Sequence, residues 1–162
     1  MTIHILIQCS KKKSLDFSPE MVWGPKSNLE SWNSDWEKQL AKTDAHKLYT
    51  GRAVKREFEF ISKTDGVEGY IISAGAGLAK FSDKIPSYES TFSNGNGPSY
   101  SQWHHLPLGG LSKIDVEEGD LIVSFAAPSY HKAIKEDPEF EKLASKFVVA
   151  STSPLSSNQD VT

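Results

Sequence analysis

Four short and continuous runs of apolar residues constrain the fold of this chain more than any other feature. The runs are unbroken rather than alternating, which is typical of strands that are covered on both faces in a mainly parallel sheet. Segments with a helical pattern separate them, and this alternation predicts an α/β domain. The four predicted strands are Ile3–Gln8, Gly69–Ser73, Asp120–Phe125 and Phe147–Ser151.

The segments between these runs repeat apolar residues at intervals of three and four, the period of a helix with one buried face. The predicted helices are Leu29–Ala41, Gly51–Lys63, Ser129–Lys135 and a further helix through Ser145 that has Asp137 as its cap and Pro138 in its first turn. The resulting prediction is a three-layer α/β/α domain around a short, mainly parallel, four-stranded central sheet. We expect residues 1–151 to form one α/β catalytic domain and residues 152–162 to form a polar tail.

Composition narrows the class of protein further. The 162 residues suffice for one domain with a sizeable core. A net charge of −3 and a pI near 5.9 do not favour non-specific binding to phosphate backbones. No apolar run reaches the ~20 residues that cross a bilayer, so we expect no membrane partner, and an N-terminus that begins directly with a strand indicates a cytoplasmic protein. Cys9 is the single cysteine and the five histidines lack the spacing of metal ligands, so we expect no disulfide, metal or cofactor.

In open α/β sheets, ligands bind beyond the carboxyl ends of the strands, which directs attention to the loops that follow them. The first strand continues into Cys9–Lys13, where backbone amides, a hydroxyl and lysines offer a cradle for phosphate or carboxylate. The alternative is a solvated lysine loop. Cys9 is either a nucleophile or a small packed apolar residue.

The next predicted strand ends in a glycine-containing turn, Ser73–Leu78, in which Gly75 and Gly77 allow the backbone to approach a ligand closely or simply to turn tightly. Tyr88 and Glu89 follow. An aromatic ring can stack on a base, and a carboxylate can stabilise a sugar cation or activate water. The alternative is a packed tyrosine beside a solvated acid.

Histidines and long loops complete the candidate site. His131, next to Tyr130 at the end of the third strand, offers a donor for negative charge on a leaving group, and His104 offers the same chemistry. His104 lies in the long loop Phe92–Gly110, and Ser14–Ser27 is a second long loop. Loops of this length within a compact domain are often functional.

Several of these segments together resemble one known group of proteins. The pattern consists of a Cys-Ser-Lys start, a Leu-Tyr-Gly segment, a Ser-Ala-x-x-Gly-Leu turn and a tyrosine–acid pair. In this chain the corresponding segments, in the same order, are Cys9–Lys13, Leu48–Gly51, Ile72–Leu78 and Ile85–Phe92. This order resembles small bacterial and phage domains related to the central domain of archaeosine synthase, with a more distant similarity to the peroxide-stress YaaA proteins. The resemblance extends from the first strand to about Phe92.

The resemblance implies a uracil-DNA-glycosylase-like α/β fold and hydrolysis of the N-glycosidic bond of a modified base in DNA, as in anti-phage DNA glycosylases. DNA is then the expected partner, and no obligate protein partner is implied. The chain departs from the family in three respects. Glu89 replaces a more usual aspartate, the insert Phe92–Gly110 has no clear counterpart, and the water-activating motif of classical uracil-DNA glycosylases is absent.

These considerations give each residue an expected role. Glu89 is the predicted catalytic group, which stabilises the sugar cation or orients water, and Asp83 is the second candidate acid. The side chains expected to fill the gap left by an extruded base are Tyr100, Trp103 and His104. The predicted substrate-binding residues are Cys9, Ser10, Lys11, Lys13, Tyr49, Ser73, Gly75, Gly77, Leu78, Tyr88, Tyr130 and His131.

Three alternatives remain open at this point. The same site suits hydrolysis or transfer on a free nucleotide or an NAD-like N-glycoside, which fits the acidic pI better. A sensor would bind a nucleotide or a modified base without turnover. An interaction domain without a small-molecule site would tolerate substitutions at Lys11, Tyr88 and Glu89.

Overall fold

The computed structural model describes residues 1–92 and 95–150. A five-stranded sheet forms its centre, in the order β4-β3-β1-β6-β7. The central strand β1 (Ile3–Gln8) pairs in parallel with β3 (Val67–Ser73) on one side and with β6 (Leu121–Ser124) on the other. The strand β7 (Phe147–Val149) extends the parallel part, whereas β4 (Gly77–Lys80) runs antiparallel to β3 at the opposite edge.

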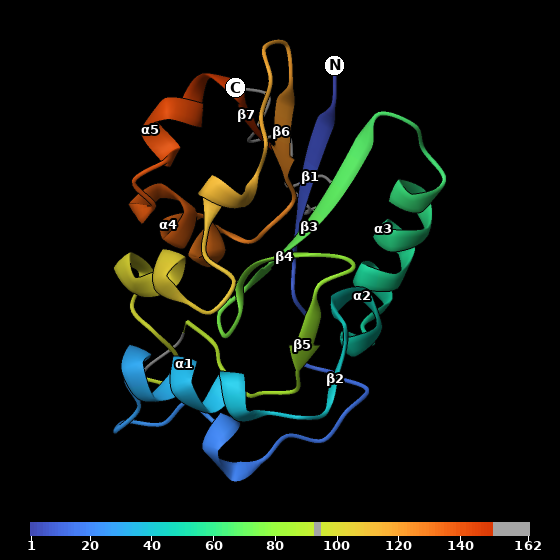
Figure 1. Cartoon of the computed structure of the whole chain (residues 1–162). Coiled ribbons are helices and arrows are strands. Elements are labelled where there is room, and N and C mark those ends of the chain that lie inside the picture. The colour runs from blue at the N-terminus through green and yellow to red at the C-terminus, as the bar shows by residue number, and fades with distance from the viewer. Residues whose placement is uncertain (93–94, 151–162) are drawn as a thin grey trace.

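Helices lie on both sides of this sheet. In Figure 1, α3 (Arg52–Ser62) covers one side, and α4 (Pro128–Glu136) and α5 (Phe140–Leu143) lie on the other, in agreement with a three-layer arrangement. The helix α3 buries Val54 and Ile61, which lie seven residues apart on one face as the apolar period predicts.

Within the described residues, none of the helices has the length and apolar character that crossing a membrane requires.

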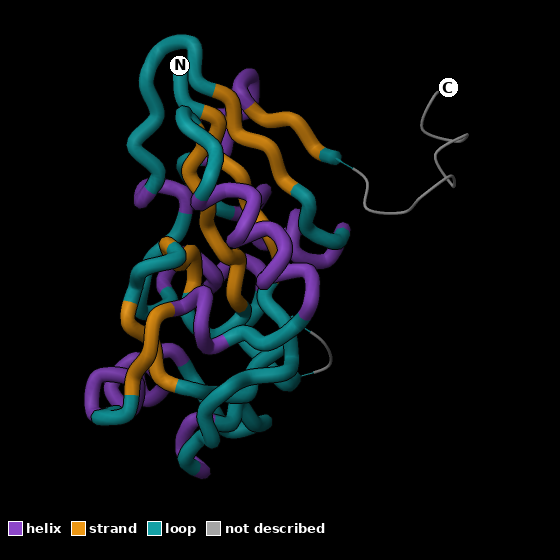
Figure 2. The backbone as a smooth tube through the Cα atoms, turned by 90° about the vertical axis from the view of Figure 1, so that its right-hand side faces the viewer, coloured by secondary structure: helices purple, strands orange, loops and turns teal. Residues whose placement is uncertain are grey.

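A smaller unit lies beyond the carboxyl ends of the central strands (Figure 1). It contains α1 (Leu29–Lys38), α2 (Ala45–Leu48) and an antiparallel pair formed by β2 (Lys42–Asp44) and β5 (Lys84–Pro86). Figure 2 shows the same separation from the side, with the second pair of strands at one end of the molecule. Short 3-10 helices complete the chain at Pro19–Met21, Tyr100–His105, Leu111–Lys113 and Ala144–Lys146.

The structure confirms the mixed α/β class and the four predicted strands, but the predicted strand number is wrong. The sheet has five strands, because the chain turns within Ser73–Gly77 and returns as β4. The sequence Gly-Leu-Ala-Lys of β4 is too short to stand out as an apolar run. The last predicted strand ends at Val149, and the predicted tail 152–162 lies outside the described residues.

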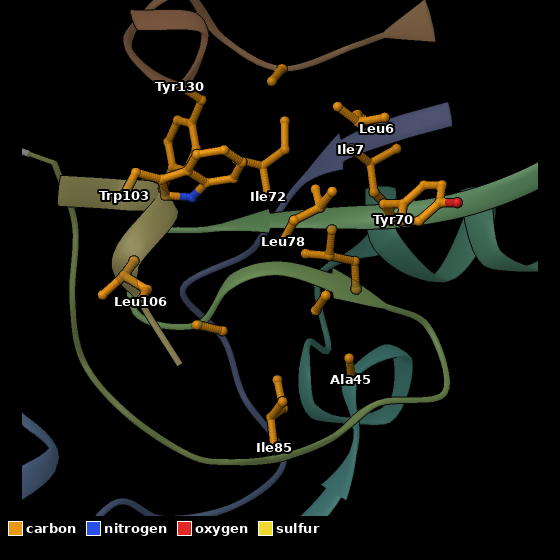
Figure 3. Close-up of a cluster of buried hydrophobic side chains, with 14 of the residues drawn as sticks. Leu6, Ile7, Ala45, Tyr70, Ile72, Leu78, Ile85, Trp103, Leu106 and Tyr130 are labelled. Carbon is orange, nitrogen blue, oxygen red and sulfur yellow. The ribbon is translucent and has the colours of Figure 1, made fainter. Parts of the chain in front are cut away.

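The core lies between the sheet and the helices and continues into the smaller unit. Figure 3 shows Leu6, Ile72 and Leu78 of the central sheet in the same cluster as Trp103 and Ile85. All five side chains are fully buried. The long loop that the sequence predicts at Phe92–Gly110 therefore contributes a tryptophan to the core, and the 3-10 helix Tyr100–His105 holds that residue in place.

The topology fixes where the chain can build a ligand site. From β1 the chain proceeds to β3 on one side, and it later returns to β6 on the other side of β1. The loops that leave β1 and β6 therefore diverge at the carboxyl ends of two adjacent parallel strands. Such a switch point leaves a crevice in which α/β proteins bind ligands.

Candidate functional site

A hollow of about 420 Å³ lies at this switch point. It receives residues from the end of β1, from the loop before α1, from the segment after β5 and from α4. The lining residues are Gln8, Cys9, Ser10, Lys11, Lys13, Val22, Trp23, Glu89, Ser90, Thr91, Asn96 and Tyr130. The structure thus brings together six of the residues that the sequence analysis selects, namely Cys9, Ser10, Lys11, Lys13, Glu89 and Tyr130.

The lysine-bearing loop after β1 is held by its contacts with the start of α3. The Ser10 hydroxyl oxygen accepts a hydrogen bond from the Gly51 N–H at 3.3 Å, and the Lys12 carbonyl accepts one from the Thr50 N–H at 3.0 Å. A side chain at Gly51 would collide with Ser10, since a Cβ there would lie 2.7 Å from the Ser10 Cβ. These contacts hold the loop at the rim of the hollow, with Lys11 exposed.

Lys13 differs from its neighbours because its side chain is half-buried and turns back over aromatic rings. Its Nζ lies 4.7 Å from the centre of the Tyr88 ring and 6.0 Å from that of Tyr49, within the range of cation–π contacts. It donates a hydrogen bond to the Lys11 carbonyl at 3.3 Å. Burial lowers the pKa of the Lys13 ammonium, and the negative charge available at Cys9 and Glu89 opposes this shift.

Glu89 stands exposed in the hollow and is anchored through its backbone. Its N–H donates to the Met21 carbonyl and its carbonyl accepts from the Trp23 N–H, both at 2.8 Å. The segment around Val22 is thereby paired with the segment around Glu89. The loop Ser14–Ser27, which sequence analysis marks as functional without naming a residue, thus supplies Val22 and Trp23 to the wall.

Cys9 and Tyr130 form the side of the hollow between β1 and α4. The Cys9 Sγ lies 3.6 Å from the Tyr130 hydroxyl oxygen. Burial raises the pKa of Tyr130, and the nearby Cys9 sulfur contributes to the same shift. The phenol therefore stays protonated at neutral pH and can act as a hydrogen-bond donor.

Tyr88 supports the hollow from below, contrary to its predicted role. Its side chain is fully buried, so it cannot stack on an extruded base. The Tyr88 hydroxyl is hydrogen-bonded to the Tyr49 hydroxyl and to the Ser73 Oγ. Burial raises the pKa of both tyrosines. Tyr49 and Ser73, which the sequence analysis predicts to contact a substrate, are fully buried in this network and do not line the hollow.

The glycine turn also serves packing rather than ligand binding. A Cβ at Gly75 would lie 2.5 Å from the Tyr88 ring, and one at Gly77 would lie 2.2 Å from the Gly109 carbonyl oxygen. Gly77 also has a positive φ of 96°, which glycine adopts readily. Leu78 is fully buried. These three residues do not line the hollow, and Gly75 packs against the Tyr88 ring.

The predicted wedge residues do not line the hollow. Trp103 is fully buried, and its indole N–H donates to the Ser73 carbonyl at 3.0 Å, so it cannot enter a base stack. Tyr100 packs against Phe92 with ring centres 5.3 Å apart. His104 is half-buried against His105.

Asp83 and His131 also lie outside the lining of the hollow. Asp83 is paired with Lys113 and accepts the Lys80 N–H at 2.8 Å, so it stabilises the turn between β4 and β5. His131 is hydrogen-bonded through Nε2 to the Ser124 hydroxyl at 2.6 Å, and burial followed by repulsion from Lys135 lowers the pKa of this histidine. The predicted role of Asp83 as a second catalytic acid and that of His131 in substrate binding are therefore not supported by their positions.

The hollow offers hydroxyl, amide, ammonium and carboxylate groups, but no assembly suited to a metal ion. In the part of the chain that the structure describes, no three His, Cys, Asp or Glu side chains converge in this way. The chemistry available here is hydrogen bonding, charge stabilisation and nucleophilic attack by an amine or a thiol.

Comparison with known proteins places the chain in a family. No curated protein and no solved structure matches it. Residues 35–150 match the model of a family described as "Family of unknown function (DUF6884)". The matched region contains Tyr49, Glu89 and Tyr130 and begins after the Cys9–Lys13 loop. Because the match covers well over half of the chain, the protein belongs to the family of unknown function DUF6884.

Proposed function

We propose that this protein hydrolyses the N-glycosidic bond between a base and its sugar in DNA. The observation that carries the proposal is the shared hollow at the switch point, where Glu89 and the half-buried Lys13 stand beside the hydroxyl of Ser10. The likeness of the sequence pattern to domains with a uracil-DNA-glycosylase-like fold supports the same reaction class. The five-stranded, mainly parallel sheet agrees with an open α/β arrangement of that kind.

The charges in the hollow suit the transition state of this reaction. Breaking the base–sugar bond builds positive charge on the sugar and negative charge on the departing base. The Glu89 carboxylate is exposed to the hollow and can stabilise the sugar cation or orient the attacking water. The Tyr130 phenol, protonated at neutral pH, also lines the hollow and can donate a hydrogen bond to the base.

The lysine-bearing loop supplies the groups that would hold phosphate. Lys11 is exposed at the rim, and Arg52, Lys55 and Arg56 follow on the outer side of α3, whose start contacts this loop. Arg56 is paired with Glu57 at 3.6 Å, and Lys11, Arg52 and Lys55 provide local positive charge on a chain whose net charge is −3. Cations in such a row attract a phosphate backbone, and this favours a nucleic-acid substrate.

A specific observation favours a second candidate, hydrolysis of a free nucleotide. The indole expected to act as a wedge, that of Trp103, is buried in the core, so it cannot replace a flipped base in a duplex. A hollow of about 420 Å³ has the size of a small-molecule site. Salt dependence separates the two candidates, since activity on DNA should fall steeply with ionic strength and activity on a mononucleotide should not.

Substitution of Glu89 tests the reaction. The Glu89→Gln variant keeps the shape of the side chain but removes its charge, so base release should fall by about 100-fold or more. Released base and abasic sites are measured by mass spectrometry after incubation with plain and modified DNA. Asp83→Asn is the matched control, because Asp83 lies outside the hollow, and it should retain activity.

The outcome distinguishes an enzyme from a sensor. Equal base release by wild type and Glu89→Gln would remove Glu89 from the mechanism. Binding of DNA or nucleotide with no product from wild type would show a sensor and contradict the proposed hydrolysis.

A further inference from the structure

Lys13 combines two contacts that occur singly elsewhere in the described residues, since Lys132 lies over the Tyr100 ring and Lys146 donates to the Glu117 carbonyl, and it also lines the hollow. Among the described residues, carboxylates pair with the lysines Lys47, Lys84, Lys113 and Lys142. In the same part of the chain, no carboxylate lies within 4.0 Å of the Lys13 Nζ. Its partners are the Lys11 carbonyl at 3.3 Å and the face of the Tyr88 ring.

The position of this amine is suited to reaction with a ligand. The Nζ belongs to a residue that lines the hollow, and it lies 4.7 Å from the centre of the buried Tyr88 ring. Burial lowers the pKa of Lys13, so a larger fraction of the amine is neutral than for a lysine in water. A neutral lysine amine in a desolvated site is the nucleophile that forms Schiff bases with carbonyl compounds.

We propose that Lys13 forms an imine with the aldehyde of the sugar that base removal leaves behind. This inference rests on the proposed function for the source of the aldehyde. A deoxyribose without its base is a hemiacetal in equilibrium with the open-chain aldehyde at C1′. The Nζ lone pair attacks C1′, the carbonyl oxygen takes up protons and leaves as water, and a C=N bond joins Lys13 to the sugar.

The imine gives the site a second reaction, cleavage of the DNA strand. The C=N bond acidifies the proton on C2′, and the exposed carboxylate of Glu89, in the same hollow, can accept it. The electron pair of that C–H bond then forms the C2′=C3′ double bond, and the bond between C3′ and its oxygen breaks. The 3′ phosphate is released, and water hydrolyses the imine to restore the Lys13 amine.

Reduction of the imine tests this inference independently of base removal. The wild-type protein is incubated with a synthetic oligonucleotide that already contains one abasic site, in the presence of sodium borohydride. Hydride adds to the C=N bond and converts the imine to a stable secondary amine. The cross-linked product is quantified on a denaturing gel, and its attachment site is located by peptide mass spectrometry.

Two variants sharpen the result. Lys13→Arg keeps the positive charge but cannot form the imine, so trapping should fall by about tenfold or more. Lys12→Arg is the matched control, since Lys12 is the exposed neighbour and does not line the hollow, and it should trap like wild type. Attachment of the sugar to Lys13 in the wild-type protein supports the inference even where a variant folds poorly.

The outcomes separate this inference from the proposed function. Trapping at Lys13 supports the inference, and base release from intact DNA is then measured separately. Absence of a cross-link, or attachment at another lysine, overturns the role of Lys13 while base release by wild type still supports hydrolysis. Base release without any cross-link would show an enzyme that hydrolyses the bond and forms no imine.

Discussion

Removal of the Ser73 hydroxyl should destabilise the fold, because this oxygen satisfies several buried groups. The Ser73 Oγ accepts the N–H of Gly75 at 3.1 Å and that of Ala76 at 2.9 Å, and it is also hydrogen-bonded to the Tyr88 hydroxyl. A buried donor left without a partner costs about 1–3 kcal/mol. Ser73→Ala leaves two N–H groups without a partner and forces the Tyr88 hydroxyl to rearrange. After partial relaxation, the free energy of unfolding should therefore fall by about 2–5 kcal/mol.

Urea and thermal denaturation measure this loss. For a domain of this size, about 3 kcal/mol corresponds to a decrease in Tm of about 6–12 °C. Ser34→Ala is the control, because Ser34 is exposed on α1, and its free energy of unfolding should stay within about 0.5 kcal/mol of wild type. A Ser73→Ala protein that unfolds at the same urea concentration as Ser34→Ala would show that the Ser73 hydroxyl does not stabilise the fold.

Two further predictions concern the turn below the hollow and the opposite end of the sheet. Gly77→Ala places a Cβ 2.2 Å from the Gly109 carbonyl oxygen at a φ of 96°, so the free energy of unfolding should fall by about 2–4 kcal/mol, and an unchanged urea midpoint would contradict this. The N–H groups of Glu117 and Thr2, followed by His4, hold the pKa of Asp120 well below its ordinary value of 3.8. As pH falls, the Asp120 carboxylate is therefore protonated at a higher pH in the unfolded chain than in the folded protein. The stabilisation by ionised Asp120 is present above about pH 4 and is lost on further acidification. Asp120→Asn should flatten the decline of the urea midpoint between about pH 4 and pH 2, and an equally steep decline would count against the role of Asp120.

The sequence predicts the central sheet well because its strands are apolar on both faces. Ile3–Gln8 lies at the centre of the sheet, and its unbroken apolar character reflects coverage from both sides. The position of the Lys13 loop follows from the same property, since ligand sites of open α/β sheets form beyond the carboxyl ends of such strands. Glu89 lines the same hollow for a different reason, because it follows β5 of the second pair of strands and its backbone pairs with the segment around Val22.

The remaining features depend on long-range packing that local sequence does not encode. Tyr88 and Glu89 are neighbours, yet one is fully buried and the other exposed, and the direction of each depends on Ser73 and Val22 far away in the sequence. The sequence did contain a signal for the short helix that carries Trp103, although not for the burial of its side chain. Ser99 and Gln102 form a capping box at the start of the 3-10 helix that carries it, a pattern that is readable as Ser-x-x-Gln.

The position of Trp23 at the wall of the hollow could not be predicted from the sequence. Its loop, Ser14–Ser27, has no regular pattern that distinguishes an aromatic residue at the wall of a hollow from one in the core. The backbone pairing of Val22 with Glu89 places Trp23 there, and this pairing joins segments more than sixty residues apart. The contribution of Trp23 to the wall of the hollow therefore follows only from the three-dimensional arrangement.

We expect the hollow at the end of β1 to hold one nucleotide, with its sugar beside Glu89. A crystal structure of the Glu89→Gln variant with a short oligonucleotide tests this placement. We expect the sugar of one nucleotide next to residue 89 and its phosphate against Ser10 and Lys11. Binding of the oligonucleotide to another face, with the hollow left empty, would contradict the account.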